Sequence, residues 1–238
     1  MVGKTLNAGQ ICLAPDYLMV PEEKLHEVIA AAQTAVAEMY PKILDNDEYT
    51  SMSNSRHYDP LSSYLAEADE RAVKVIPLNT ANEDCSNQEN TRKIPPTLIA
   101  EPSDDMLVMQ EELFGPLLPI KTYKEFDETI NFVNANPRPL AAYYFGEDKE
   151  EEEAVLTRTT SGGACINDVI MHGMQEGLPF GGVGPSGMGA YHGEKGFQTF
   201  SHAKSIYSQA KINIAKLGGM LPPYGKATEN TIKMQVKR

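Results

Sequence analysis

The sequence predicts an α/β fold, a layered domain with a largely parallel sheet and flanking helices. Strand-like and helix-like segments alternate several times along the chain, which is the pattern of parallel strand-helix-strand units. The 238 residues suit one large domain or two small ones. Apolar residues make up 41% and charged residues 23%, which is ordinary for a globular domain with a hydrophobic core.

The first part of the chain opens this alternation. Residues 1–15 are expected to end a helix and run into a turn, and residues 16–21 to form a short buried strand. A helix follows from Pro21, because proline fits a first turn and the two glutamates after it favour the positive helix end. This helix should end near Tyr40. Its apolar face recurs at helical spacing: Leu25, Val28, Ile29, Ala32 and Val36.

The middle of the chain continues in the same way. A polar loop over residues 45–55 precedes a helix over 60–72 and a strand over 73–77. Residues 79–93 are polar and carry no periodic pattern. We therefore expect them to form an exposed excursion in which Cys85 has no special role.

The second half repeats strand and helix. Strands are expected over residues 96–99, 117–123, 141–145 and 163–166. Helices are expected from Phe126 to a point before Pro137, and over the acidic residues 149–157. The alternation stops after Ser205, so the last residues are expected to form a short basic helix or a frayed tail.

Charge and composition exclude several classes of partner. Lys and Arg number 21 against 33 Asp and Glu, and the net charge of −12 repels phosphate backbones, so no nucleic-acid partner is expected. No apolar run is long enough to span a bilayer and no signal-peptide pattern is present, so no membrane partner is expected. Cys12, Cys85 and Cys165 stand far apart, and the histidines form no H-x-x-x-H pair. This pattern predicts no metal site and a reducing, cytoplasmic location.

Residues 3–15 carry Cys12 among small and amide side chains. A thiolate is a strong nucleophile toward a carbonyl carbon, so a positioned cysteine can hold an acyl group as a thioester. Gly9 permits close approach of backbone or substrate, and Asn7 and Gln10 supply amide hydrogen bonds. On residue chemistry alone, a single cysteine beside apolar residues is more often an inert core residue.

Two later clusters have residues suited to a binding site. Residues 110–116 place two carboxylates before an apolar pair and a Gly-Pro turn. A carboxylate can accept hydrogen bonds from both hydroxyls of a ribose and a ring can pack against a nicotinamide, but a helix end before a turn has the same pattern. Residues 178–189 are rich in glycine, which indicates close approach or positive φ, without the ending of a phosphate loop. A tight surface loop is the alternative.

Together, these three clusters resemble the aldehyde dehydrogenase superfamily in their order and spacing. Residues 3–12 look like its catalytic-cysteine motif, N-x-G-Q-x-C. Residues 112–116 resemble its E-x-F-G-P motif, and residues 179–189 resemble its P-F-G-G-x-x-x-S-G-x-G loop. Residues 96–98 are similar to its P-T-L strand.

Further segments narrow the resemblance, which covers nearly the whole chain. Segments that look like the class-3-like branch of the superfamily are residues 7–17, 56–58, 137–141, 163–172 and 187–193. Segments similar to bacterial coniferyl aldehyde dehydrogenases within that branch are residues 91–97 and 222–225.

The resemblance implies an oxidoreductase that converts an aldehyde to its acid with NAD or NADP, the aldehyde being coniferyl or another aromatic or medium-chain aldehyde. Cys12 would attack the carbonyl to give a thiohemiacetal and then a thioester. Glu112 would hold the nicotinamide ribose and Phe114 would border the nicotinamide. Asn167 and Phe180 would line the substrate pocket.

The resemblance also implies what the chain lacks. In the family, a Rossmann-type cofactor domain, an oxyanion-hole asparagine and a general-base glutamate precede the cysteine motif, and this chain starts only a few residues before it. We therefore expect residues 1–205 to form the catalytic domain without the cofactor domain, and residues 206–238 a tail for packing or oligomerisation. Expected partners are a small-molecule aldehyde, and either a homo-oligomer or a complementing N-terminal cofactor domain. The alternative is a non-catalytic truncated domain that only associates with partner or homologous subunits.

Overall fold

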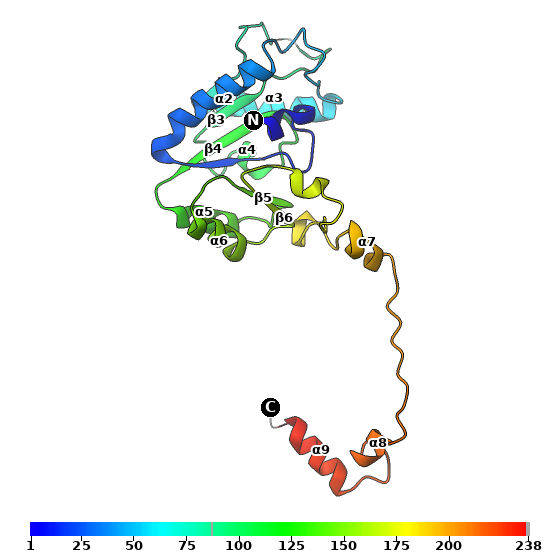
Figure 1. Ribbon diagram of the computed structural model, residues 1–238. Coiled ribbons are helices and arrows are strands. Elements are labelled where there is room, and N and C mark those ends of the chain that lie inside the picture. The colour runs from blue at the N-terminus through cyan, green and yellow to red at the C-terminus, as the bar shows by residue number, and fades with distance from the viewer. Residues whose placement is uncertain (87, 237–238) are drawn as a thin grey trace. The chain divides into compact units, whose positions relative to one another are not determined.

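The computed structural model describes residues 1–86 and 88–236 of the chain (Figure 1). They divide into two compact units, Met1–Phe200 and Ser201–Arg238. The predicted boundary at residue 205 and the role predicted for the tail stay predictions. Within the described residues, no helix is both long enough and apolar enough to cross a membrane.

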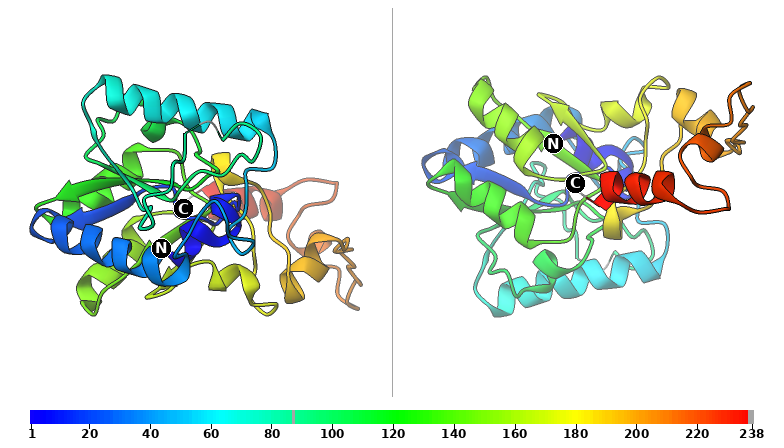
Figure 2. Two further views of the ribbon diagram at one scale, coloured as in Figure 1. Left: turned by 90° about the horizontal axis from the view of Figure 1, so that it is seen from above. Right: turned by 90° about the horizontal axis from the view of Figure 1, so that it is seen from below.

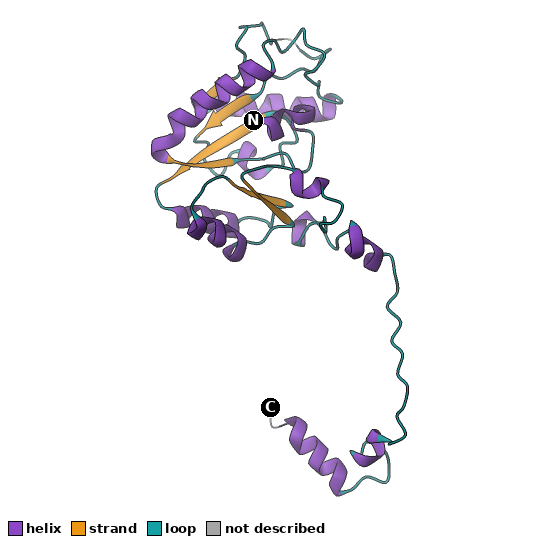
Figure 3. Cartoon of the chain, in the orientation of Figure 1, coloured by secondary structure: helices purple, strands orange, loops and turns teal. Residues whose placement is uncertain are grey.

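The first unit contains the strands and most of the helices, which alternate along the chain (Figure 3). Its strands are β1 (Leu18–Pro21), β2 (Lys74–Pro77), β3 (Thr97–Ala100), β4 (Leu117–Tyr123), β5 (Ala141–Tyr144) and β6 (Gly163–Ile166). Its α-helices are α1 (Val2–Thr5), α2 (Leu25–Met39), α3 (Ser55–Glu70), α4 (Leu107–Gln110), α5 (Phe126–Ala135), α6 (Lys149–Arg158) and α7 (Gly193–Thr199). Its 3-10 helices are η1 (Leu6–Gly9), η2 (Glu22–Lys24), η3 (Met171–Met174) and η4 (Gly184–Ser186). The second unit holds α8 (Ile214–Leu217) and α9 (Lys226–Val236), so the last described residues form a helix, which is one of the two forms predicted for them.

The strands confirm the predicted α/β class. Four of them form a sheet in the order β1-β4-β3-β2, in which β1 and β3 run parallel to β4 while β2 runs antiparallel to β3. Strands β5 and β6 pair in parallel in a separate two-stranded sheet. The division into two sheets was not predicted, because periodicity marks a strand without saying which edges exchange hydrogen bonds.

Helices α2 and α3 cover opposite faces of the four-stranded sheet (Figure 2). Successive side chains of a strand point to opposite faces, and the core follows this rule. Leu98 of β3 and Leu118 of β4 pack in the cluster of α2, whereas Ile99 and Leu117 pack in the cluster of α3. This burial on both faces explains why β3 is a continuous apolar run in the sequence rather than an alternating one.

The start of α3 was predicted wrongly. The helix begins at Ser55, five residues before the predicted start, and Pro60 lies inside it. The side-chain oxygen of Asn54 accepts a hydrogen bond from the backbone N–H of His57 at 3.3 Å and caps the new first turn. The prediction used Pro60 as a first-turn residue, but the helix continues through it, because the Asn54 cap and the packing of the helix outweigh the missing hydrogen bond and the steric clash of an internal proline.

Among residues 79–93, those that the structure describes are mostly exposed, as predicted, but the segment is anchored by hydrogen bonds. The carboxylate of Glu83 accepts the backbone N–H groups of Ile43 at 2.5 Å and Leu44 at 3.1 Å. The Lys93 ammonium donates to the carbonyls of the same two residues at 3.2 Å and 3.0 Å. One acid and one base therefore tie this segment to the end of the α2 region, which composition alone did not reveal.

Leu61 offers a direct test of the α3 packing. Its side chain is fully buried against the sheet. We expect Leu61→Ala to lower the free energy of unfolding by about 2–5 kcal/mol, because it removes buried apolar atoms and leaves a cavity. The same replacement at Leu156, which is 50% exposed on α6, should change it by about 0.5 kcal/mol or less. Urea unfolding followed by circular dichroism measures both, and equal losses would contradict this packing.

Candidate active site

Cys12 follows a loop whose backbone is held by its own amides. Asn7, Ala8 and Gly9 adopt positive φ values of 51°, 52° and 75° in succession. The side-chain amide of Asn7 donates to the carbonyl of Gln10 at 3.2 Å, and the amide of Gln10 donates to the carbonyl of Asn7 at 2.9 Å. The Gln10 side-chain oxygen also accepts the backbone N–H of Ser53 at 2.9 Å. These two amides therefore fix the loop, as the sequence suggested, and offset the cost of its left-handed backbone.

Cys12 itself lies at the tip of a tight turn. The backbone N–H of Ala14 donates to the carbonyl of Ile11 at 2.9 Å, so Cys12 and Leu13 are the two central residues of the turn. The thiol-bearing residue is exposed, whereas the next side chain, Leu13, is buried. The hydroxyl of Tyr143 on β5 donates to the carbonyl of Leu13 at 2.8 Å. The result is an accessible thiol on an anchored backbone, not an inert core cysteine.

The Cys12 loop packs directly on the second motif. A Cβ atom at Gly9 would lie 2.3 Å from the carbonyl oxygen of Gly115, so only glycine allows this approach. The carboxylate of Asp16 accepts the backbone N–H of Leu113 at 3.1 Å. Two segments about one hundred residues apart are thus brought together, which sequence order alone could not establish.

The two predicted cofactor residues lie in this second motif. Glu112 is exposed, and a carboxylate in that position can accept hydrogen bonds from a diol. Phe114 is half-buried at a φ of 42°, and its ring centroid lies 5.7 Å from that of His57 on α3. An exposed acceptor next to a partly covered ring fits a ribose and its attached aromatic base.

A buried charge lies beneath both motifs. Lys4 is 1% exposed, and its burial lowers the pKa of the ammonium to about 8, against the opposing attraction of Asp16 and Glu112. Burial likewise raises the pKa of Asp16, while Lys4 and the N–H of Leu113 act in the opposite direction. The base and the two acids therefore form one electrostatic group that joins the Cys12 loop to Glu112.

Phe180 sits in a cluster of aromatic rings. Its centroid lies 5.6 Å from that of Tyr191, 6.0 Å from that of His192 and 6.1 Å from that of His172. The backbones of Phe180 and Tyr191 exchange two hydrogen bonds of 2.9 Å. A Cβ atom at Gly173 would lie 2.7 Å from a methyl carbon of Leu13 and 3.2 Å from the Phe180 ring. Gly173 thus lies between the Phe180 ring and the side chain of Leu13, the residue that follows Cys12.

Both polar groups of the Asn167 side chain are engaged in hydrogen bonds to the backbone of Gly146. Its side-chain oxygen accepts the N–H of Gly146 and its amide donates to the carbonyl of Gly146, both at 2.9 Å. This reciprocal pair ties the end of β6 to the end of β5. The prediction that Asn167 lines the substrate pocket stays a prediction.

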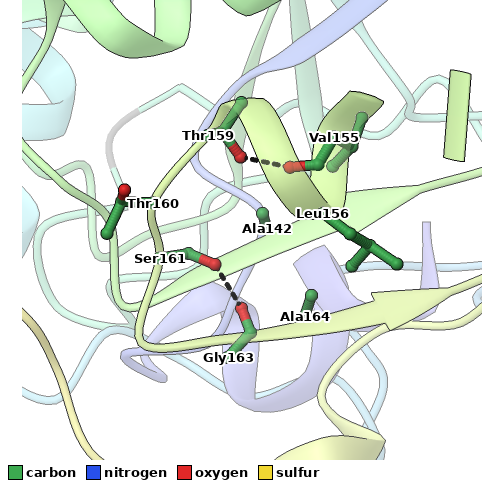
Figure 4. Close-up of a pocket in the computed structure, with 8 residues that line it drawn as sticks. All are labelled: Ala142, Val155, Leu156, Thr159, Thr160, Ser161, Gly163 and Ala164. Atoms are coloured by element: carbon green, nitrogen blue, oxygen red, sulfur yellow. Dashed lines mark hydrogen bonds between the residues drawn. The ribbon is translucent and has the colours of Figure 1, made fainter. Parts of the chain in front are cut away.

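A pocket of about 270 Å³ lies elsewhere, between α6 and the β5–β6 sheet (Figure 4). Its lining residues are Ala142, Val155, Leu156, Thr159, Thr160, Ser161, Gly163 and Ala164. None of the predicted site residues is among them. Within the described residues, no group of three or more His, Cys, Asp or Glu side chains could hold a metal ion.

Comparison with known families identifies the class of protein to which this chain belongs. The model of the aldehyde dehydrogenase family matches residues 1–206, and the chain belongs to that family. The chain is 54% identical to a probable coniferyl aldehyde dehydrogenase of Caulobacter vibrioides, over 100% of this chain and 49% of the relative. It is 53% identical to the coniferyl aldehyde dehydrogenase of a Pseudomonas species, over 97% of this chain and 48% of the relative. The resemblance predicted from the motifs is therefore confirmed.

Solved structures agree with the fold. The substrate-bound state of Staphylococcus aureus AldH aligns with a TM-score of 0.80 at 38% identity, over 98% of this chain and 49% of that chain. An NAD-dependent aldehyde dehydrogenase from Sinorhizobium meliloti aligns with a TM-score of 0.73 at 26% identity, over 84% of this chain and 39% of that chain. The chain spans about half the length of the curated relatives it matches.

Sequence reasoning missed the charged residues of the site. Lys4 and Asp16 flank the Cys12 motif in the sequence, but nothing in their spacing says that Lys4 is buried and Asp16 half-buried. A usable signal was the presence of opposite charges at both ends of an otherwise uncharged stretch. Charged side chains that are removed from water are usually paired, so opposite charges at the two ends of an uncharged stretch indicate a pair of charges that interact.

Lys4 predicts an unusual rise of stability with pH. Between the folded pKa of about 8 and the 10.5 of an unburied lysine, the unfolded chain holds a proton that the folded chain has lost. The contribution of Lys4 to the free energy of unfolding should therefore rise with pH in this window, by about 1.5 kcal/mol from pH 8 to pH 9.5, whereas Cys85 and the tyrosines whose pKa values are raised by burial oppose it. Urea unfolding at both pH values measures it. The difference in free energy of unfolding between the wild type and Lys4→Met should grow by this amount between the two pH values. The difference between the wild type and Lys124→Met, whose side chain is 76% exposed, should stay constant; a constant difference for Lys4→Met would contradict the burial of Lys4.

Proposed function

We propose that this chain supplies the cysteine-bearing catalytic part of an aldehyde dehydrogenase, an oxidoreductase that converts an aldehyde to its acid with NAD or NADP. The observation that carries the proposal is the exposed Cys12 on an anchored turn, packed against the segment of Glu112 and Phe114. The names of the two coniferyl aldehyde dehydrogenase relatives favour coniferyl aldehyde or another aromatic or medium-chain aldehyde as substrate.

The chemistry begins at the Cys12 sulfur. As a thiolate it attacks the carbonyl carbon of the aldehyde and forms a thiohemiacetal. We assign the backbone N–H of Cys12 to donate a hydrogen bond to the oxygen on which negative charge develops. Because the turn is closed by the Ala14–Ile11 hydrogen bond, that N–H is part of a fixed backbone rather than a mobile one. After oxidation Cys12 carries the acyl group as a thioester, and water releases the acid.

Glu112 and Phe114 are the residues we assign to the cofactor. The Glu112 carboxylate would accept hydrogen bonds from the nicotinamide ribose, and the Phe114 ring would border the nicotinamide. When bound, NAD or NADP supplies the two-electron oxidant of the reaction. The name of the Sinorhizobium meliloti relative, an NAD-dependent enzyme, supports NAD as the cofactor. Phe180 and Asn167 are assigned to the substrate pocket, the former because of its closeness to Leu13.

The complete reaction needs further groups. A cofactor-binding domain, a second oxyanion donor and a general base are assigned to the part of the relatives that this chain does not cover. We propose that these groups come from a complementing N-terminal half, and that the chain works in a cytoplasmic homo-oligomer or such a complex. Removing one oxyanion donor costs about 100- to 1000-fold in rate, so the isolated chain should be nearly inactive.

A non-catalytic association domain is the second candidate. Exposed apolar side chains in the second unit favour it, since Ile206 is 83% exposed, Tyr207 82% and Leu217 70%. Calorimetry on the isolated chain tests this second candidate, because tight binding of NAD would remove it.

The role of Cys12 predicts a reconstitution result. The chain, co-expressed with the N-terminal half of a coniferyl aldehyde dehydrogenase relative, should form NADH from NAD and coniferyl aldehyde. Cys12→Ala should lower this rate by about 1000-fold or more, because no other group can carry the acyl intermediate. Cys85→Ala, in the anchored loop, is the matched control and should keep the wild-type rate. Activity that survives in Cys12→Ala, or no activity from two halves shown to associate, would reject the proposal.

A further inference from the structure

The bond between Tyr143 and Leu13 links the small sheet to the nucleophile's turn. It joins residues 130 positions apart, at 2.8 Å, and its acceptor is the carbonyl immediately after Cys12. The turn's own closure is the single Ala14–Ile11 backbone bond. The Leu13 carbonyl and the Ala14 N–H belong to one peptide group, so the Tyr143 bond restrains the same peptide whose N–H closes the turn.

Strand alternation explains how Tyr143 reaches this place. Successive side chains of β5 point to opposite faces of the two-stranded sheet. Tyr144 lies on the α6 face, where its hydroxyl donates to the Glu151 carboxylate at 2.8 Å. Tyr143 therefore lies on the other face, the one that meets the Cys12 loop. Two neighbouring tyrosines thus serve two separate contacts, and only one of them concerns the nucleophile.

The Tyr143 ring is itself held in position. Tyr143 is opposite Cys165 in the register of β5 and β6. The Cys165 sulfur lies 3.1 Å from Nδ1 of His172, and the His172 ring centroid lies 6.1 Å from that of Tyr143. Burial raises the pKa of the Tyr143 phenol to about 12, so its hydroxyl stays protonated and able to donate at any pH near neutrality. This buried support makes the tyrosine a fixed anchor instead of a surface contact.

We propose that Tyr143 is a positioning residue for Cys12, and that its hydroxyl fixes the turn in the orientation from which the thiol attacks the aldehyde. Tyr143 acts through the Leu13 carbonyl and touches no reacting atom in this role. The proposal rests on the proposed function for its catalytic consequence, whereas the restraint on the turn is independent of any substrate. A site that must be held within about half an ångström depends on such supporting bonds.

The test compares two single-hydroxyl deletions in the full chain, Tyr143→Phe and Tyr144→Phe. Hydrogen exchange of the Ala14 amide, read by NMR, should become about 3- to 10-fold faster in Tyr143→Phe, which is the effect of one neutral hydrogen bond. It should be unchanged in Tyr144→Phe. 4-Aminophenylalanine at position 143 restores a donor and should restore slow exchange, whereas 4-fluorophenylalanine keeps the bulk without a donor and should not. Circular dichroism verifies that each variant is folded. If Tyr143→Phe does not fold, the variant with 4-fluorophenylalanine at position 143 takes its place in the comparison.

The catalytic consequence is measured in the complex with the N-terminal half of a relative. There the kcat of Tyr143→Phe should fall by about 10-fold with KM within about 2-fold, since orientation and not binding is lost. Unchanged Ala14 exchange, or an unchanged kcat in an active complex, would overturn the positioning role. If Ala14 exchange responds but no variant oxidises any aldehyde, the restraint on the turn stands and the proposed function fails.

Discussion

The approach of Gly9 to the carbonyl of Gly115 is the contact on which the site depends. At this distance no side chain fits, and the Asp16–Leu113 hydrogen bond holds the two segments at that separation. The contact brings a thiol-bearing turn, an exposed carboxylate and a half-buried ring to one region of the fold. A wider spacing between Gly9 and Gly115 would separate Cys12 from Glu112 and Phe114, the residues assigned to the cofactor.

Holding the segments together has an electrostatic cost that the fold balances locally. Lys4 is withdrawn from water at the start of the Cys12 segment, and its pKa of about 8 records that cost. Asp16 and Glu112 partly compensate it, so charge and packing act on the same two segments. An apolar residue at position 4 would pack more cheaply, but it would leave the half-buried Asp16 carboxyl without its base. The Lys4 ammonium and the Gly9 contact therefore both hold the Cys12 segment against the segment of Glu112.

The sequence predicted most elements because their causes are local. The apolar spacing from Leu25 to Val36 and the run in β4 need no knowledge of their neighbours. The start of α3, the four residues of α4 and the separation of β5 and β6 from the larger sheet depend on a cap, on packing and on edge pairing, which periodicity does not encode. In the site, motif order identified Cys12, Glu112 and Phe114 as candidates. It could not reveal that the Asn167 amide is engaged by Gly146, since that bond exists only between two strand ends.

The exposure of this region bears on how the site works. Cys12 and Glu112 both face solvent, and the pocket beside α6 contains neither of them. In open water a free Cys12 thiolate would be oxidised and an acyl thioester on Cys12 would be hydrolysed without control, and developing charge would be screened. Under the proposed function, the surface that bears Cys12, Glu112 and Phe114 would form one side of an active-site cleft. The hydrogen bonds that fix the Cys12 turn matter in that arrangement, because the groups on the other side of the cleft would have to meet a nucleophile whose position is already set.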